Sequence, residues 1–406
     1  MFLRVLLITL SLPFSLFQLL SGVAAAQSVT SLCQPSVTPP IIIDTHDQVK
    51  DAGKSAEPPI GTLKDTGGFG FAWPDTQMGV IKTANGYEFF TSDGAFHPRH
   101  TWEGQRVGNN NYGSVVTTVG TLDNPLGTGV PWDVTISPNP DPGVNPNYFG
   151  YSYIGGGPVF QVPAGMTGAG NLIVGYHAEL PNDALYAVHG LAASWDNGLH
   201  WTDLGEVVRP NQSYAPNLNG FDEIGDGPLV LSPDRKYFYF YFPDWPAGTT
   251  TTTHISVARA PVESVVEAAF GSAHPHTVVF EKFYSGSWNL QPGIGGASTD
   301  LIPGSQYAGY LDVHYNSALQ RYVLITSDDT NFAYAESTDG LNWTLPVLLG
   351  DYGNGNIAAY PTSVGLGDDP SILGKSFYIY YTFLRPENGG LPREGNSLRR
   401  ITLSCP

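Results

Sequence analysis

Two aspartates, Asp75 and Asp93, lie at the open end of a predicted β-hairpin and are the first residues in the chain that could do chemistry together. The stretch between them is rich in β-branched and aromatic residues around Asn85-Gly86, a dipeptide typical of tight hairpin turns. A turn centred on this dipeptide places Asp93 opposite Met78, three residues from Asp75 along the strand. Paired carboxylates at one end of a hairpin are the groups that cleave glycosidic bonds by acid–base chemistry.

The same hairpin pattern recurs four more times, and each copy carries polar groups at its open end. In chain order these groups are His177 and Glu179, Asp226 and Asp244, Asp312 and His314, and Tyr360. A unit repeated five times predicts a ring of similar sheets rather than a single layered core. We therefore predict an all-β fold, a five-bladed β-propeller in which the innermost strand of each blade lines a central channel.

Composition agrees with this class. The chain has 406 residues with 48 Gly, 33 Pro and 12% aromatic residues, which is typical of many short strands joined by turns. Only the segment 261–270 favours a helix. Outer strands are expected at 114–120, 186–194, 200–208, 255–258 and 277–280, and residues 124–147 are expected to form a long surface loop.

The candidate site residues are the polar and aromatic groups at the open ends of the hairpins. The predicted catalytic carboxylates are Asp75, Asp93, Asp226 and Glu179. The predicted substrate-binding residues are Trp73, His177, Glu223, Trp245, Asp312, His314 and Tyr360. For each aspartate the alternative is a turn cap, and for each histidine a buried core residue. We expect no cofactor and no catalytic metal, although a structural Ca²⁺ in the channel would suit its carboxylates.

Within this set the roles are ranked. Asp75 is predicted to be the nucleophile or base, because it begins the innermost strand of the first blade, and Asp93 is its partner. Glu179 and Asp226 are the reserves, since each enters the channel from another blade. Like-charged neighbours raise the pKa of a carboxyl group, which lets an aspartate serve as the acid.

The N-terminus and the charge restrict the location and the partners. Arg4 and an apolar run precede Ala24-Ala25-Ala26, so residues 1–26 are predicted to be a signal peptide of a secreted protein, extracellular or periplasmic, with a membrane anchor as the alternative. The net charge of −18 disfavours nucleic acids and anionic membranes. Neutral carbohydrates remain the natural partners, and we expect a monomer.

Two cysteines, Cys33 and Cys405, stand near opposite ends of the chain. In an exported protein they are predicted to form a disulfide, which requires a fold that brings its ends together; two separate thiols are the alternative. Residues 27–60 are predicted to supply a closing strand, Ile41–Asp44, to the last sheet. Residues 61–406 would then form one propeller domain.

The hairpins resemble those of known enzymes. The layout is similar to the five-bladed propeller glycosidases of the arabinanase, β-xylosidase and invertase type, which place a catalytic Asp at the start of blade one and an acid before a Gly-Pro in blade three. Asp226-Gly227-Pro228, or nearby Glu223, would supply that acid. This likeness spans about residues 60–403.

A narrower resemblance covers only the first hairpin. The run from Asp75 to Val80, followed by Phe89-Phe-Thr-Ser-Asp93-Gly, resembles the D-x-G-V … F-G-D-T opening of the bacterial endo-D-arabinanase-like family. In that family two aspartates of this hairpin are implicated in catalysis, which implies Asp75 and Asp93 here. Two features depart from the family pattern: Gln77-Met78 alters the D-x-G-V spacing, and Ser92 replaces the usual Gly. An arabinofuranosidase-type activity is what the resemblance implies.

Two other functions are compatible with a propeller. The turns Ser194–Trp201 and Ser337–Trp343 fit the S-x-D-x-G-x-x-W Asp box of sialidases, the second one residue shorter, and their role is structural. A sialidase needs clustered arginines for the substrate carboxylate, whereas the candidates lie mostly in loops or turns: Arg99, Arg106, Arg209 and Arg235. A non-catalytic lectin is the other alternative. The sequence leaves open the sugar, the linkage, endo or exo action and the stereochemical outcome.

Overall fold

The computed structural model describes residues 33–36, 39–44, 74, 76–92, 113–125, 127, 132–141, 143–145, 151, 153–180, 186–214, 222–245, 253–271, 278–307, 309–384 and 397–406. Trp73, Asp75, Asp93 and the predicted signal peptide lie outside the described residues.

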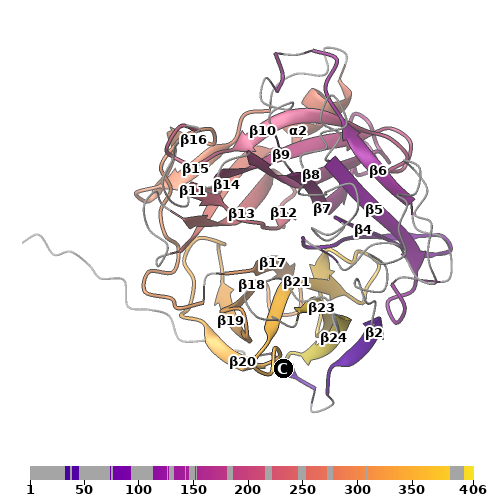
Figure 1. Cartoon of the computed structure of the whole chain (residues 1–406), viewed down its shortest axis with the longest axis vertical. Helices are drawn as coiled ribbons and strands as arrows, with labels where there is room; N and C mark the ends of the chain where they lie inside the picture. Colours follow the sequence, from indigo (N-terminus) through magenta and orange to yellow (C-terminus); the bar gives the residue numbers. More distant parts are fainter. Residues whose placement is uncertain are drawn as a thin grey trace, which may run out of the picture.

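The described strands form five antiparallel blades arranged in a ring (Figure 1). Blade 1 contains β3 (Gly79–Thr83), β4 (Gly86–Thr91), β5 (Gly113–Gly120) and β6 (Trp132–Ser137). Blade 2 contains β7 (Tyr153–Gln161), β8 (Leu172–Leu180), β9 (Tyr186–Ser194) and β10 (Trp201–Val208). Blade 3 contains β11 (Asp222–Ile224), β12 (Leu229–Leu231), β13 (Tyr237–Trp245), β14 (His254–Pro261), β15 (Glu281–Tyr284) and β16 (Ser287–Pro292).

The other two blades complete the ring. Blade 4 contains β17 (Leu311–Asn316), β18 (Arg321–Ser327), β19 (Asn331–Ser337) and β20 (Val347–Asp351), and β22 (Ile372–Leu373) pairs with β17. Blade 5 contains β21 (Ile357–Gly365), β23 (Ser376–Leu384), β24 (Ser397–Ser404) and the N-terminal strands β1 (Gln34–Pro35) and β2 (Ile41–Asp44). The predicted five-bladed propeller is thus confirmed.

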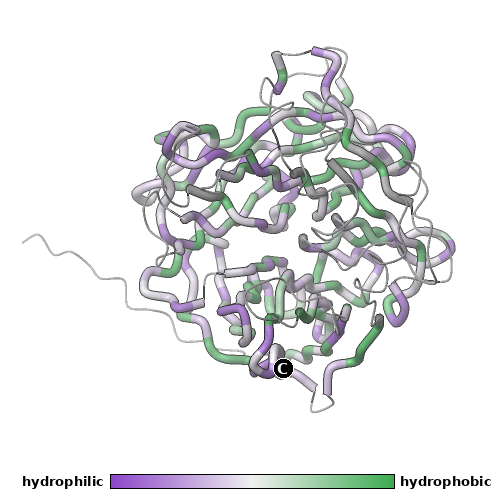
Figure 2. The backbone as a smooth tube through the Cα atoms, viewed as in Figure 1, coloured by the Kyte–Doolittle hydropathy of each residue, from purple (hydrophilic) through white to green (hydrophobic). Residues whose placement is uncertain are grey.

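Apolar side chains fill the junctions between neighbouring blades. Strands with apolar residues on both faces, such as β13, contribute to two junctions at once: Phe240 packs toward blade 2 and Tyr241 toward blade 4. Figure 2 shows hydrophobic stretches running along strands of the blades. Because every blade is buried on both faces, the core is a series of inter-blade layers around the channel.

One α-helix, α2 (Val262–Phe270), follows β14 of blade 3, close to the predicted segment. Its Val265, Val266, Ala268 and Ala269 are buried. Within the described part of the chain no helix is both long and apolar enough to cross a membrane.

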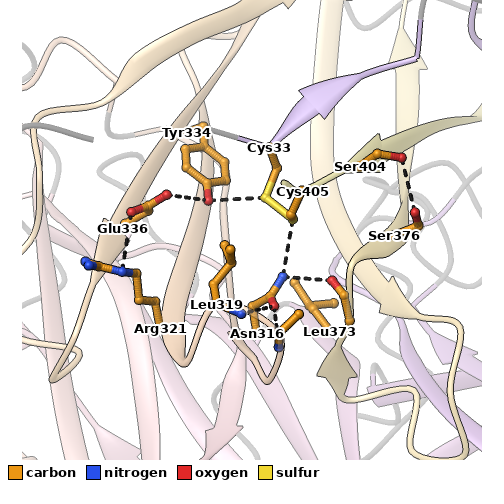
Figure 3. The surroundings of a disulfide bond; sticks show 12 residues. Cys33, Asn316, Leu319, Arg321, Tyr334, Glu336, Leu373, Ser376, Ser404 and Cys405 are labelled. Atoms are coloured by element: carbon orange, nitrogen blue, oxygen red, sulfur yellow. Dashed lines mark hydrogen bonds and ion pairs between the residues drawn. A yellow bond between two sulfur atoms is a disulfide. The ribbon is translucent and has the colours of Figure 1, made fainter. Parts of the chain in front are cut away.

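The N-terminal strands close the ring, as predicted. Ile41 of β2 pairs with Arg400 of β24, and β2 lies beside β24 in Figure 1. A Cys33–Cys405 disulfide joins the ends, with a Cα–Cα distance of 4.0 Å across a sequence separation of 372 (Figure 3). Tyr334 Oη lies 3.4 Å from Cys33 Sγ. The disulfide therefore sits against blade 4 as well as blade 5.

Reducing this disulfide is expected to lower the stability of the native fold without abolishing it. A cross-link over nearly the whole chain stabilises by about 4–5 kcal/mol in the chain-entropy model, while the packing between blades remains. Thermal unfolding with and without a reductant measures the effect. The double variant Cys33→Ser/Cys405→Ser is the control, because its melting temperature should match that of the reduced protein and ignore the reductant. Equal melting temperatures for the oxidised and the fully reduced protein would contradict the expectation.

The register of the first hairpin differs from the prediction. Thr83 pairs with Gly86, so the turn residues are Ala84 and Asn85 rather than Asn85-Gly86. Gly86 instead begins β4 with a φ of 143°. The shift moves every pair by two residues, and extending the ladder from Gly79–Phe90 places Thr91, not Asp93, opposite Met78.

Two outer strands were also misplaced. Residues 124–147, expected as a loop, contain β6, whose W-D-V-T-I-S sequence alternates between polar and apolar residues inside a segment dominated by Pro, Gly and Asn. The strand after α2 is β15 rather than residues 277–280. Glu281 pairs there with Arg259 across the ladder, and their side chains form an ion pair at 2.8 Å. The strand begins with the charged residues Glu281 and Lys282, so a search for alternating hydrophobic residues does not find it.

Candidate active site

A cavity of about 260 Å³ opens between the blades on the side where the hairpins carry their polar groups. Blades 2, 3, 4 and 5 all contribute to its lining. The lining residues are His177, Glu179, Gly225, Asp226, Pro243, Trp245, Gly309, Tyr310, Asp329 and Tyr360. Five predicted site residues are therefore brought together here: Glu179, Asp226, His177, Trp245 and Tyr360.

Asp226 reaches the cavity because the inner strand of blade 3 is interrupted there. The backbone leaves the β13 ladder between Ile224 and Leu229. Gly227 is required in this segment, since a Cβ atom at that position would lie 1.7 Å from the carbonyl oxygen of Tyr241. Only glycine can come so close to another backbone. Pro228, the next residue, has no backbone N–H, so the interruption of the ladder leaves no donor unpaired at that position. The Gly-Asp-Gly-Pro sequence thus presents Asp226 on irregular backbone.

His177 and Glu179 come from β8 of blade 2, two residues apart and therefore on one face of the strand. On the inner strand the residue paired with His177 is Gly155, which has no side chain to stand between His177 and the channel. His177 Nε2 lies 3.6 Å from Glu179 Oε1, and its Nδ1 lies 3.6 Å from Asp226 Oδ1. The imidazole ring thus links a carboxylate of blade 2 with one of blade 3.

The environment of Asp226 favours its protonated form. Its side chain is 15% exposed, and burial together with the charge of Glu179 raises its pKa to about 6, although His177 opposes the shift. The Glu179 side chain, in contrast, is 34% exposed. A carboxyl group with a pKa near 6 beside a second, more exposed carboxylate is the arrangement that general acid catalysis uses.

This raised pKa carries a cost in stability that Asp226→Asn should remove. The folded protein binds the Asp226 proton more tightly than the unfolded chain, so the free energy of unfolding falls as the pH rises from about 4 to about 6 and stays lower above. At pH 7 the loss is about 3 kcal/mol for a pKa shift of about two units. Asp226→Asn should therefore be more stable than the wild type at pH 7.

Urea unfolding of both proteins between pH 4 and pH 7 measures this gain. Their difference isolates Asp226, because Asp203, a second buried carboxyl group with a pKa of about 6, is present in both. The gain should become small near pH 4, where Asp226 is protonated in the folded chain and about half protonated in the unfolded chain. A gain independent of pH, or a loss at pH 7, would contradict the assigned protonation.

His189 is a residue of this site that the sequence did not reveal. It pairs with His177 across β8 and β9, and its Nε2 lies 2.6 Å from the carbonyl oxygen of Gly225, the residue before Asp226. Burial, and after it the neighbouring His177, lowers the pKa of His189 to about 3, so the ring is neutral and its Nε2–H donates to Gly225. His189 thus positions the segment that carries Asp226. Nothing in its sequence context, Val188-His189-Gly190, distinguishes it from a core residue.

Asp312 and His314 lie in a different place. They line a separate cavity of about 40 Å³ in the channel, together with residues of the inner strands of the other blades. Asp312 Oδ2 accepts a hydrogen bond from the Ser363 backbone N–H at 2.7 Å, and Asp312 Oδ1 lies 3.2 Å from His314 Nε2. His314 Nδ1 lies 2.9 Å from the carbonyl oxygen of Ser371. These side chains connect blades 4 and 5, and the space beside them suits water molecules rather than a sugar ring.

The remaining predicted residues flank the site or fall outside the described part. Glu223 pairs with Trp245 in the β11–β13 ladder. Asp244 accepts a hydrogen bond from the Ser298 hydroxyl group, which ties β13 to the loop after β16. Among the described residues no group of three or more His, Cys, Asp or Glu side chains is arranged to hold a metal ion. Asp75, Asp93 and Trp73 stay predictions.

The two Ser-x-Asp turns make structural contacts. In the first, Ser194 Oγ accepts from Gly198 N at 2.8 Å and Asp196 Oδ1 from His200 N at 2.9 Å. Trp201 is buried and packs edge-on against Phe90 of blade 1. In the second, Trp343 packs against Tyr241 of blade 3. Both tryptophans therefore fill junctions between blades, far from any acid–base role.

Among known proteins, this chain is similar only to solved structures. No family model and no curated protein matches the sequence. A family 117 glycoside hydrolase from Zobellia galactanivorans is similar over 86% of this chain and 89% of its own, at 12% identity and a TM-score of 0.47. An N-acetylgalactosamine deacetylase from F. plautii has 12% identity over 92% and 95% of the two chains, with a TM-score of 0.46.

The catalytic domain of a GH62 alpha-L-arabinofuranosidase from Coprinopsis cinerea has 14% identity over 89% of this chain and 98% of its own, with a TM-score of 0.45. Identities this low leave the activity of this chain to be argued from its own residues.

Proposed function

We propose that this protein is a secreted glycoside hydrolase that acts on a neutral polysaccharide or oligosaccharide of plant or microbial origin, with arabinan-type furanosides as the first candidate substrate. The observation that carries the proposal is the pair Glu179 and Asp226, which face one cavity on either side of His177. The Cys33–Cys405 disulfide supports export, because disulfides persist in oxidising compartments.

In this proposal Asp226 is the general acid that protonates the glycosidic oxygen of the leaving group. A second carboxylate attacks the anomeric carbon or activates a water molecule. Two residues compete for this second role: Glu179, which lies in the cavity, and Asp75, which the sequence and the family resemblance indicate. His177 lies 3.6 Å from an oxygen of each of its two carboxylate neighbours and, when protonated, would attract both.

The separation of Glu179 and Asp226 bears on the mechanism. Since one oxygen of each carboxylate lies 3.6 Å from a nitrogen of the same imidazole ring, the two carboxylates are close enough for either the roughly 5 Å spacing of retaining enzymes or the wider spacing of inverting ones. If Glu179 is the second carboxylate, the anomeric configuration of the first product decides between the two outcomes. If Asp75 has that role, the stereochemical outcome is set by its own distance to Asp226.

A substrate panel tests the activity. The purified protein is incubated with arabinan, xylan, fructan and arabinogalactan, and the released sugars are separated and quantified. We expect release from arabinan, and the size of the products distinguishes endo from exo action. Release from another neutral polymer would keep the enzyme class and correct the substrate. Binding to a polymer without release of any sugar would identify a lectin instead and overturn the proposal.

The sialidase alternative has no specific support in the cavity. Among the described residues that line it there is no arginine to bind a substrate carboxylate, and three of them are acidic: Glu179, Asp226 and Asp329. Hydrolysis of a sialoside by the wild type would nevertheless overturn the proposed substrate class, so a sialoside belongs in the panel.

A further inference from the structure

Blades 2 and 3 contribute Glu179 and Asp226 to the cavity, and blades 4 and 5 build the rest of its wall. Gly309 and Tyr310 precede β17, Asp329 stands in the turn between β18 and β19, and Tyr360 interrupts β21. The backbones of this wall are tied together, since Ser327 N donates to the Tyr310 carbonyl at 3.0 Å and Ala358 N donates to the Asp329 carbonyl at 2.6 Å. Backbone hydrogen bonds therefore fix the positions of these segments relative to one another.

Two consecutive aspartates of the β18–β19 turn have opposite environments. Asp328 Oδ1 accepts hydrogen bonds from the backbone N–H groups of Thr330 and Asn331, at 3.1 and 2.7 Å, and so acts as the turn cap. The carboxylate of Asp329 accepts no hydrogen bond from the part of the chain that the structure describes, and it lines the cavity. Burial, and after it the charge of Asp328, raises the pKa of Asp329. As a residue Asp329 is exposed, so its carboxylate oxygens are open to hydrogen-bond donors of a ligand that enters the cavity.

The backbone of this wall is left-handed at both Asp329 and Tyr360, with φ values of 76° and 52°. Aspartate tolerates this region, whereas an aromatic residue such as Tyr360 rarely occupies it and is strained there. At Tyr360 the strain coincides with a bulge in the β21–β23 ladder between Ala359 and Thr362. Strained residues of this kind cost about 1–3 kcal/mol each and cluster at ligand sites.

An aromatic pair completes the wall. The rings of Tyr310 and Tyr360 lie 4.6 Å apart, centroid to centroid, at an interplanar angle of 62°. Tyrosine rings offer an apolar face to the C–H groups of a sugar and a hydroxyl group to its oxygens. A carboxylate beside such a pair is suited to accept hydrogen bonds from sugar hydroxyl groups.

From this arrangement we propose that Asp329, Tyr310 and Tyr360 form a sugar-binding subsite in which the Asp329 carboxylate accepts hydrogen bonds from hydroxyl groups of a neutral sugar. The inference rests on the proposed function, because it places a second sugar unit of the substrate across the cavity from Glu179 and Asp226. A third carboxylate in the lining also repels anionic sugars, so Asp329 selects neutral substrates over acidic ones. Asp329 binds substrate here and takes no part in proton transfer.

The test measures affinity separately from turnover. In the Asp226→Asn background, which binds without cleaving, the dissociation constants of arabinopentaose and xylopentaose are measured by calorimetry. The background is compared with the same protein carrying Asp329→Asn and with one carrying Asp328→Asn. Asparagine tolerates left-handed φ values, so Asp329→Asn keeps the backbone, and Asp329→Gly is the second variant should the first fail to fold. Asp328→Asn is the matched control: it makes the same change one residue away and keeps the capping oxygen.

Asp329→Asn should weaken the binding of the cleaved sugar by about 10- to 100-fold, the effect of losing hydrogen bonds to a charged acceptor. Asp328→Asn should leave the binding unchanged. With Asp226 intact, Asp329→Asn should raise KM far more than it lowers kcat.

Three outcomes would overturn the subsite. If the parent cleaves and binds a pentaose but Asp329→Asn binds it equally well, the subsite is wrong and the glycosidase stands. If Asp328→Asn weakens binding as much as Asp329→Asn does, the loss comes from the changed net charge of the turn and not from a direct contact between Asp329 and the sugar. If the parent neither cleaves nor binds any neutral oligosaccharide, the proposed function fails and the subsite with it.

Discussion

Replacing Asp226 by asparagine should reduce kcat on the natural polymer by about 10²–10⁴-fold, the contribution of a positioned general acid. The substitution removes the proton and changes little in volume. Since the acid acts by protonating the leaving oxygen, the loss should shrink on an aryl glycoside whose leaving group needs no proton. This dependence on the leaving group separates an acid from a residue that merely shapes the cavity.

The pH profile gives an independent readout of the same residue. Asp226 must be protonated to act, so kcat/KM of the wild type should fall as the pH rises through about 6, the pKa of Asp226. In Asp226→Asn this alkaline limb should disappear. Asp368→Asn is the control, because Asp368 is fully exposed and pairs with Lys82 away from the cavity. Retention of both the wild-type rate and the alkaline limb in Asp226→Asn would remove Asp226 from the mechanism.

Asp75→Asn should reduce turnover by several orders of magnitude if the sequence prediction for the second carboxylate holds. The residue stands in the chain between Pro74 and Thr76, both of which are anchored to other blades. The Pro74 carbonyl accepts from Thr382 Oγ1 of blade 5 at 2.8 Å, and Thr76 Oγ1 donates to the Gly156 carbonyl of blade 2 at 3.3 Å. The two chain neighbours of Asp75 are thus tied to blades on both sides of blade 1.

Asp93→Asn and Glu179→Gln complete this experiment, which is read from kcat on the polymer of the panel. The revised hairpin register brings Ser92 N within 3.4 Å of Thr76 Oγ1, so the chain neighbours of the two aspartates touch. A large loss in Asp75→Asn with a smaller one in Glu179→Gln would assign the nucleophile or base to Asp75. Near-wild-type turnover in both Asp75→Asn and Asp93→Asn would refute the first-hairpin assignment and leave Glu179 with that role.

The fold was predictable because its information is local and repeated. Each hairpin carries its own turn and its own alternation. The interruption of the inner strand of blade 3 at Asp226 was not predicted, although the Gly and Pro residues around it disfavour a regular strand. The closing strand and the disulfide followed from one topological requirement, that the ends of a ring meet. Strand β6 was missed because its alternation is embedded in a segment of loop-like composition.

Which polar residues line the cavity was less predictable, since this depends on the local backbone conformation and on how deep each residue lies in the channel. Asp328 and Asp329 are adjacent and chemically identical, yet hydrogen bonds make one a cap and a φ of 76° aims the other into the cavity. Asp312 follows the same repeat pattern as Asp226, but its inner strand is regular and its carboxylate bonds to the next blade. Such differences arise from contacts between blades, which no single hairpin encodes.

The way in which β1 and β2 complete blade 5 also sets an order for folding. Their partner β24 is the last of the described strands, so among these strands this pairing has the largest sequence separation. Blades 1 to 3 and the four main strands of blade 4 are close in sequence and can form before the chain is finished, whereas β2 has no partner until β24 has been made. We therefore expect closing the ring to be a late step of assembly, during which Ile41 and Ile42, exposed even in the finished fold, have to be kept from pairing elsewhere.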